Sequence, residues 1–172
     1  ITTWIRKHLR LEVNATKSGV GRPWERKFLG FTINPRGEIE VAPPSVERFG
    51  NKVREMWRSC QSLSSERLRD RWRAYVRGWW AYYGLAEHRR NIFGLEGWIR
   101  RHIRSCFWQR WHDWRGRLRK LRQLGLSGRL LKVAHSSRGA WRIAASPSLQ
   151  TALSNAVLRR WGFVMPSELA SP

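Results

Sequence analysis

Acidic residues are scarce in this chain of 172 residues. Twelve Asp and Glu stand against 34 Lys and Arg, which gives a formal net charge of +22 at pH 7. Such an excess of positive charge excludes the balanced surface of an ordinary enzyme and predicts a polyanionic partner. Nucleic acid is the first candidate and an anionic membrane is the second.

Long apolar runs are also missing. No stretch approaches the ~20 apolar residues that a membrane-spanning helix needs, and no signal peptide opens the sequence. We therefore expect no membrane partner and a cytoplasmic protein. Arginine far outnumbers lysine, and its forked guanidinium suits phosphate contacts and stacking on bases. These observations favour nucleic acid.

Metal ligands are few and scattered. The two cysteines, Cys60 and Cys106, lie far apart and match no metal-binding spacing, so we expect two buried, reduced thiols. The pair His112 and Asp113 is adjacent in sequence, and neighbours on a helix point in different directions, which argues against a catalytic dyad. The sequence predicts no metal site and no catalytic residue. The five histidines are His8, His88, His102, His112 and His135.

The most informative segment is the stretch 68–83, LRDRWRAYVRGWWAYY. Its apolar residues recur at steps of three and four, which predicts an amphipathic α-helix. Arg69, Arg73 and Arg77 lie at i, i+4 and i+8, so they share another side of this helix. The alternative is an ordinary helix whose arginines are simply solvated. The predicted buried side contains Leu68, Trp72, Tyr75, Val76, Trp79 and Tyr83.

Strand signals are confined to the first quarter of the chain. Segments 27–33 and 38–41 flank Asn-Pro-Arg-Gly at 34–37, where proline presets a turn and glycine accepts positive φ, so we predict a β-hairpin. Segment 11–13 could be a further short strand, after the tail of a helix at 1–9. Ala42-Pro43-Pro44 ends the hairpin, and we place a domain boundary there, with domains 1–42 and 43–172.

The remainder reads as helices, so the predicted fold class is mainly α: a helical bundle preceded by a short β-hairpin. Ser45 is expected to cap the helix after the boundary, and Ser64 or Ser65 the helix at 68–83. A short helix at 115–122 should end at Gly125, and another is possible at 127–137. Ser146-Pro147 should open one last helix that continues to Gly162.

A second basic and aromatic pattern follows residue 95. One side is apolar and includes Leu95, Ile99, Ile103 and Trp114. For Trp114, packing against the helix at 68–83 is favoured over contact with RNA. Another side mixes guanidinium groups with rings, a mixture typical of binding to unpaired or irregular RNA. For Trp108 and Trp111, packing and stacking remain equally open. The mixed side consists of Arg101, Arg104, Trp108, Trp111 and Arg115, and the window 64–122 holds sixteen Arg or Lys against five Asp or Glu.

Four motifs together resemble a known family. FLGF at 28–31, YVRGWWAYY at 75–83, WIRR at 98–101 and LG at 124–125 occur in this order. The series resembles the C-terminal part of group II intron-encoded reverse transcriptases. The resemblance implies that 1–42 is the end of the polymerase palm and 43–172 the thumb, or maturase-specific X domain. It further implies binding to intron RNA during splicing, a grip on the RNA/DNA template-primer duplex, and contact with the fingers and palm of a parent protein.

The chain departs from the complete family in its carboxylates. Reverse transcriptases hold Mg²⁺ on palm aspartates, because phosphoryl transfer needs metal charge on the reacting oxygens. The two aspartates here, Asp70 and Asp113, lie in no such segment. We therefore expect no cofactor in this fragment and no polymerase activity alone, with Mg²⁺ used by a full-length RNA-directed DNA polymerase. The residues after Trp161 contain no His or Cys for a nuclease domain.

The resulting prediction is an RNA-binding thumb and maturase domain, in which cations hold phosphates and indole rings stack on bases. With about six phosphates engaged, raising salt from 50 to 200 mM should weaken binding roughly a thousandfold. The alternatives are a general basic DNA- or RNA-binding module and a piece active only when joined to its polymerase. The predicted RNA contacts are Arg69, Arg73, Arg77, Trp80, Arg101, Arg104, Trp108, Trp111, Arg115, Lys120 and Arg122.

Overall fold

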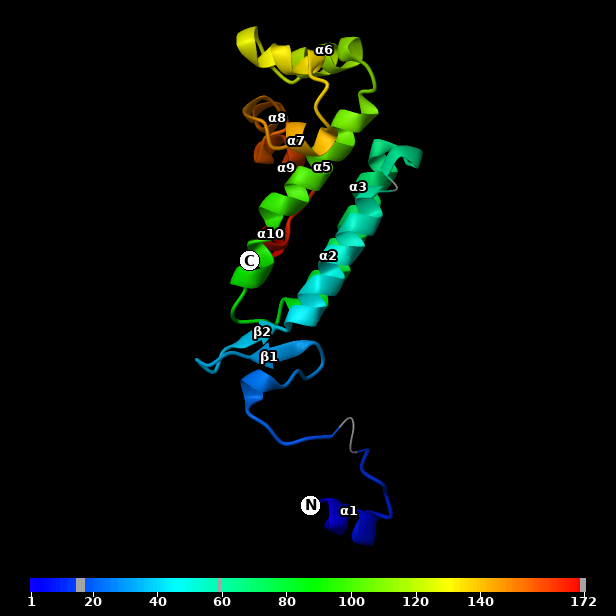
Figure 1. Cartoon of the computed structure of the whole chain (residues 1–172), viewed down its shortest axis with the longest axis vertical. Coiled ribbons are helices and arrows are strands. Elements are labelled where there is room, and N and C mark those ends of the chain that lie inside the picture. Colours follow the sequence, from blue (N-terminus) through cyan, green and yellow to red (C-terminus); the bar gives the residue numbers. More distant parts are fainter. Residues whose placement is uncertain (15–17, 59, 171–172) are drawn as a thin grey trace.

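A computed structural model describes residues 1–14, 18–58 and 60–170, without the side chain of Cys60, so the expected burial of that thiol lies outside the described part. The fold is mainly helical with one early hairpin (Figure 1), which confirms the predicted class. The elements are α1 (Thr2–Leu9), η1 (Pro23–Glu25), β1 (Phe31–Ile33), β2 (Ile39–Val41), α2 (Pro43–Arg58), η2 (Cys60–Ser62), α3 (Ser65–Tyr83), α4 (Arg90–Phe93), α5 (Glu96–Arg110), α6 (Trp114–Gln123), η3 (Gly128–His135), α7 (Ala140–Ile143), α8 (Pro147–Ala152), α9 (Asn155–Arg160) and α10 (Pro166–Leu169), where η denotes a 3₁₀ helix.

The predicted hairpin is present. Strands β1 and β2 pair antiparallel, with Phe31 opposite Val41. The side-chain oxygen of Asn34 accepts hydrogen bonds from two backbone N–H groups of the turn, and Gly37 adopts φ of 86°, a region that suits glycine. The suggested strand at 11–13 is wrong, because those residues pair with no described strand and Leu11 is 60% exposed.

Three long helices form the body of the molecule. In Figure 1, α2, α3 and α5 run alongside one another, and rings of α2 contact rings of α3. Leu68, Trp72 and Val76 of α3 are fully buried, as the spacing of 68–83 predicts. Each large apolar side chain buried in this way stabilises the fold by about 1.5–3 kcal/mol, so the seam of α3 is a major contributor.

The C-terminal helices close over this body. The indole Nε1 of Trp72 donates to the carbonyl of Val164 at 2.8 Å. At the start of α5, the buried carboxylate of Glu96 accepts from the backbone N–H of Ser167 at 2.7 Å and pairs with Arg100 at 2.9 Å. These bonds fasten the segment after α9 to both α3 and α5.

Helix boundaries differ from the predictions in two places. Helix α2 begins at Pro43, so Ser45 is not its cap; this side chain is buried inside the first turn, where its Oγ accepts from Arg48. The predicted last helix is two helices, because the chain leaves helical geometry at Leu153 and Ser154 caps α9. Ser64 caps α3 and Ser146 caps α8, as predicted.

The apolar side predicted after residue 95 also changes direction. Helix α5 ends at Arg110, and Asp113 caps a new helix by accepting from the N–H of Gly116 at 2.6 Å. Trp114 therefore starts α6 with a new rotational phase, and it is 44% exposed. The prediction that Trp114 packs in the core is wrong, because it assumed one continuous helix.

Three smaller observations complete the comparison with the predictions. Cys106 is buried, as predicted. Of the helices in the described ranges, none has the length and apolar character to cross a bilayer. The segment 127–137 is helical, as suggested, although η3 is a 3₁₀ helix.

Candidate nucleic-acid interface

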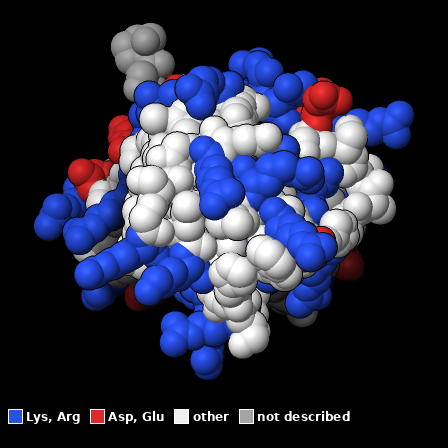
Figure 2. All heavy atoms as spheres, turned by 90° about the horizontal axis from the view of Figure 1, so that it is seen from above, with Lys and Arg blue, Asp and Glu red and all other residues white. Residues whose placement is uncertain are grey.

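Positive charge predominates over negative charge at the end of the molecule that carries α6. Figure 2 views this end from above, where Lys and Arg side chains are scattered among uncharged residues across the visible face and outnumber Asp and Glu. Charge alone does not define a site, since phosphate recognition also needs groups gathered around a concave surface. Such a surface occurs where α3, α6 and the turn after α9 meet.

We call this surface the cationic hollow. Its volume is about 430 Å³. It lies between the N-terminal part of α3, the end of α5, the side of α6 and the end of α9 with the residues that follow it, so segments nearly a hundred positions apart build it. It is lined by Ser65, Glu66, Arg69, Phe107, Lys120, Arg160, Trp161 and Phe163.

Local backbone signals set the position of each wall. Ser64 caps α3 by accepting from the N–H of Arg67 at 3.2 Å, which fixes the turn that carries Arg69. Gly162 has φ of 87°, and this left-handed turn separates Trp161 from Phe163. A Cβ placed on Gly162 would lie 2.8 Å from Cδ of Arg69, so the turn rests directly on the arginine.

The floor of the hollow is aromatic. Phe107 and Phe163 are buried, and Trp161 is half-buried. The rings of Phe107 and Trp161 meet edge to face with centroids 5.1 Å apart, and Phe107 meets Phe163 in the same way at 5.7 Å. Such pairs hold each ring in one orientation. The floor is therefore a fixed apolar surface beneath charged walls.

The cations of the hollow differ in whether their side chains already form hydrogen bonds or ion pairs within the protein. Nε of Arg69 lies 2.8 Å from Oδ1 of Asp70, and this hydrogen bond lowers the pKa of Asp70 and raises that of Arg69. Lys120 and Arg160 are exposed, and neither side chain forms a hydrogen bond or ion pair within the described residues. Two cations at the mouth are thus available for an anionic ligand.

The predicted row on α3 continues from the hollow. Arg73 is half-buried, and its Cδ lies 3.8 Å from the Cβ position of Gly162. Arg77 is exposed one turn further along, and a rise of 1.5 Å per residue places Arg69 and Arg77 about 12 Å apart along the axis. The structure therefore brings together Arg69, Arg73 and Lys120 of the predicted set, with Arg77 extending the line.

Arg101 lies elsewhere. Its guanidinium carbon is 4.2 Å from the ring centroid of Trp141, and its Nε donates to the carbonyl of that residue at 3.0 Å. Trp141 and His102 line a second hollow of about 340 Å³. Since successive helical residues are rotated by about 100°, His102 and Phe107 are about 140° apart around α5. The two hollows occupy different sides of this helix.

Three predicted contacts belong to the core. Arg104 is 8% exposed, and it donates to the carbonyl of Leu153 at 2.9 Å and to Oδ1 of Asn155 at 3.0 Å. Burial lowers its pKa. Trp108 is 1% exposed and Trp111 is 9% exposed. Packing and stacking on RNA were both open for these rings, and in the structure both rings pack in the core. Buried side chains offer no surface to RNA, and we exclude these three from the interface proposed below.

The remaining predicted residues lie apart from the cationic hollow. Trp80 packs in a small cluster near the hairpin, with its ring centroid 5.9 Å from that of Phe93. Arg115 and Arg122 are exposed on α6, but they are rotated about 140° and 160° from Lys120 around the helix. They form the opposite flank of the basic end.

Of the residues that line the hollow, only Arg69 and Lys120 are among the predicted contacts, and Arg160 and Trp161 are the most consequential of those that the sequence does not indicate. Arg160 and Trp161 come from the end of a helix that was expected only to close the core. A signal was present, because a cation and an indole stand directly before Gly162, where a turn exposes side chains. Which other elements this turn would meet is a tertiary question that local patterns do not answer.

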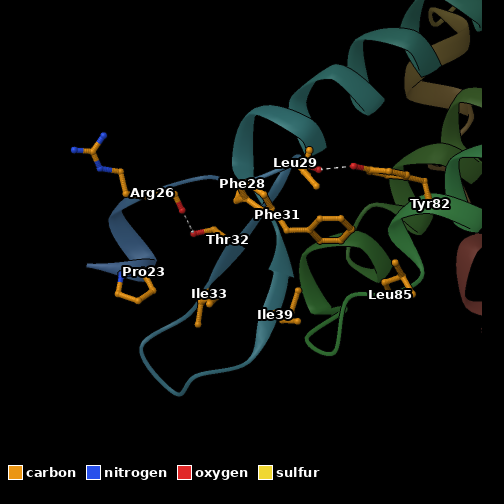
Figure 3. Close-up of a pocket in the computed structure, with 10 residues that line it drawn as sticks. All are labelled: Pro23, Arg26, Phe28, Leu29, Phe31, Thr32, Ile33, Ile39, Tyr82 and Leu85. Atoms are coloured by element: carbon orange, nitrogen blue, oxygen red, sulfur yellow. Dashed lines mark hydrogen bonds between the residues drawn. The ribbon is translucent and has the colours of Figure 1, made fainter. Parts of the chain in front are cut away.

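An apolar groove beside the hairpin has a different character. It measures about 480 Å³, and Figure 3 shows Phe28, Leu29, Ile39 and Leu85 arranged around it. Of the ten residues that line it, only Arg26 carries charge. A surface with so few cations does not attract phosphate, so the nucleic-acid interface is not placed here. In the described ranges, no group of three or more His, Cys, Asp and Glu is arranged to hold a metal ion.

One comparison with known proteins found a match that covers part of this surface. Residues 46–125 match the family model for the group II intron, maturase-specific domain. The matched segment begins in α2 and ends just after α6, so it contains Arg69, Arg73, Arg77 and Lys120 but not the turn after α9. A search of curated proteins found no match to the chain. The family match supports a maturase-related role with group II intron RNA as the general class of partner.

Proposed function

We propose that this chain binds folded group II intron RNA through the cationic hollow and the arginine row of α3. The observation that carries the proposal is the meeting of Arg69, Lys120 and Arg160 over an aromatic floor, next to the row that continues through Arg73. Two of these elements, α3 and α6, lie within the segment that matches the maturase-specific domain. Phosphate contacts supply affinity, and the folded shape of the RNA supplies selectivity.

The number of cations sets the expected salt dependence. Five candidate phosphate contacts lie along this surface: Arg69, Arg73, Arg77, Lys120 and Arg160. With a slope of about −0.9 per contact, the logarithm of the association constant should fall by about 4.5 per tenfold rise in salt. Between 50 and 200 mM salt the affinity should therefore drop about 500-fold.

The experiment measures RNA binding by fluorescence anisotropy at several salt concentrations. The double variant Lys120→Gln/Arg160→Gln should lower affinity and flatten the slope by about 1.8. Arg36→Gln is the matched control, because this arginine is exposed on the hairpin turn, away from the hollow. A slope near zero, or a double variant that behaves like the control, would refute the proposal.

Competition separates an intron-related role from general nucleic-acid binding. A structured intron RNA should displace a bound intron fragment at much lower concentration than a random DNA duplex of equal length. Equal displacement would favour a general basic module, because phosphate contacts alone do not distinguish the two.

We further propose that the parent protein is an RNA-directed DNA polymerase, in which this chain grips the template-primer duplex and the hairpin forms the end of the palm. The resemblance of segments 28–31 and 75–83 supports this assignment. Catalytic Mg²⁺ would be held by residues outside this chain. Primer extension by the chain alone, with Mg²⁺ present, should give no product; extension would refute the assignment of catalysis to missing segments.

A further inference from the structure

We propose that the cationic hollow holds one unstacked nucleotide of the RNA, with its base on the aromatic floor and its phosphate at the mouth. This inference rests on the proposed function and specifies the form of RNA that the site takes. The first argument is size. A volume of about 430 Å³ lies near the lower end of the roughly 300–1,000 Å³ that pockets for small ligands occupy. A base fits such a space, whereas a continuous duplex can only pass over it.

The second argument is the arrangement of rings. Phe107 is buried and meets the ring of Trp161 edge to face, and the buried Phe163 meets Phe107 on its own side in the same way. Trp161 remains half-buried and lines the hollow. Aromatic side chains in such positions bind the faces of unpaired bases in RNA-binding proteins. An indole fixed in this way loses little conformational freedom when a base stacks on it.

The third argument is the distribution of charge. Lys120 and Arg160 have no protein partner among the described residues and lie at the mouth, while Arg69 forms part of the wall. The carboxylate of Glu66 lines the α3 side. It can accept hydrogen bonds from amino groups of a base. The unpartnered side chains of Lys120 and Arg160 favour the phosphate on their side, and Glu66 favours the base on the other.

The ligand class follows from these three features. A nucleotide whose base is already outside the stack, in a bulge or a loop, reaches the hollow without loss of pairing. The site should therefore prefer RNA with an unpaired nucleotide over a fully paired stem. Contacts from Arg73 and Arg77 to the neighbouring backbone would be common to both RNAs.

The test compares two hairpin RNAs that differ by one bulged nucleotide, which is 2-aminopurine in the fluorescent version. The protein should bind the bulged RNA roughly 5- to 150-fold more tightly, the range that the loss of one base–aromatic stack produces. Stacking on Trp161 should also quench the 2-aminopurine fluorescence. Trp161→Ala should remove both the preference and the quenching while the salt slope stays unchanged.

Trp141→Ala is the matched control, because Trp141 is a partly exposed indole of α7 that lies beside another side of α5, away from the cationic hollow. It should keep both the preference and the quenching. Should Trp161→Ala fail to fold, as judged by thermal unfolding, the quenching measured with the unsubstituted protein decides. Equal binding of the two RNAs with a steep salt slope and no quenching would refute the hollow as a nucleotide site and leave RNA binding intact. A flat salt slope would instead refute the proposed function.

Discussion

Arg104 allows a sharp test of the division between core and interface. The sequence places it among the predicted RNA contacts, whereas the structure buries it between α5 and the residues around Leu153. Two hydrogen bonds, to the carbonyl of Leu153 and to Oδ1 of Asn155, are its polar contacts with the C-terminal helices. Arg104→Met keeps most of the side-chain volume and removes both bonds.

The magnitude follows from those bonds. Each hydrogen bond from a charged donor contributes about 1.5–3 kcal/mol. The loss is partly offset because the variant no longer pays the cost of burying a cation away from water. We expect the free energy of unfolding to fall by about 2–4 kcal/mol. For a domain of this size, each kcal/mol shifts Tm by about 2–4 °C, so Tm should fall by roughly 5–15 °C.

Two measurements on the same variant distinguish the roles. Denaturant unfolding followed by circular dichroism reports stability, and anisotropy at several salt concentrations reports RNA contacts. Arg90→Met, at an exposed position of α4, is the control and should change neither. If Arg104→Met leaves stability unchanged but flattens the salt slope by about 0.9, Arg104 contacts phosphate and the structural assignment is refuted.

Three further predictions concern other parts of the fold. Asp113→Ala removes the cap of α6 and should lower the free energy of unfolding by about 1 kcal/mol, measured by denaturant titration; Asp113→Asn, which retains a capping oxygen, should lose less. Gly162→Ala places a Cβ at φ of 87° against Arg69, so both Tm and RNA affinity should fall, and an unchanged Tm would contradict the described turn. Burial lowers the pKa of His102 from 6.5 to about 4, so the unfolded chain binds more protons than the folded chain between these pH values. The free energy of unfolding should therefore decrease as pH falls from 6.5 to 4. In His102→Gln this decrease should be smaller when unfolding is measured across the same pH range.

The sequence was sufficient where one local pattern and the tertiary packing required the same arrangement. Leu68, Trp72 and Val76 repeat with helical spacing, and α3 buries all three. Asn34 and Gly37 have the turn chemistry of a hairpin, and the hairpin forms. In these segments the local signal leaves few alternatives, so the structure adds distances rather than a new interpretation.

The sequence was insufficient where the rotational phase of a helix changed. The spacing of tryptophans after residue 107 was treated as one helix, but the cap at Asp113 starts a second helix with a new phase. Trp108 and Trp111 belong to α5 and its end and are buried, whereas Trp114 belongs to α6 and is exposed, which reverses the expected order of burial. A cap is recognised by its hydrogen bond, and Asp at position 113 alone did not reveal that α5 had already ended.

Long-range contacts account for the rest. Arg160 and Trp161 were not among the predicted contacts, because their role depends on a turn at Gly162 that rests on α3. Arg104 was predicted to face RNA, because its position on the helix was known but the helices that cover it were not. Periodicity describes the sides of one helix, and it gives no information about which side meets another element.

The fastening of the C-terminal segment has a consequence for synthesis of the chain. Trp72 donates to the carbonyl of Val164 across 92 positions, and the hollow needs Arg160 and Trp161 to be complete. During translation, α3 and α6 are made before this segment exists, so the ribosome holds a growing chain whose pocket still lacks one wall. A nascent chain can attract ribosomal RNA through its charge, but it acquires the pocket only when its last helices have been made.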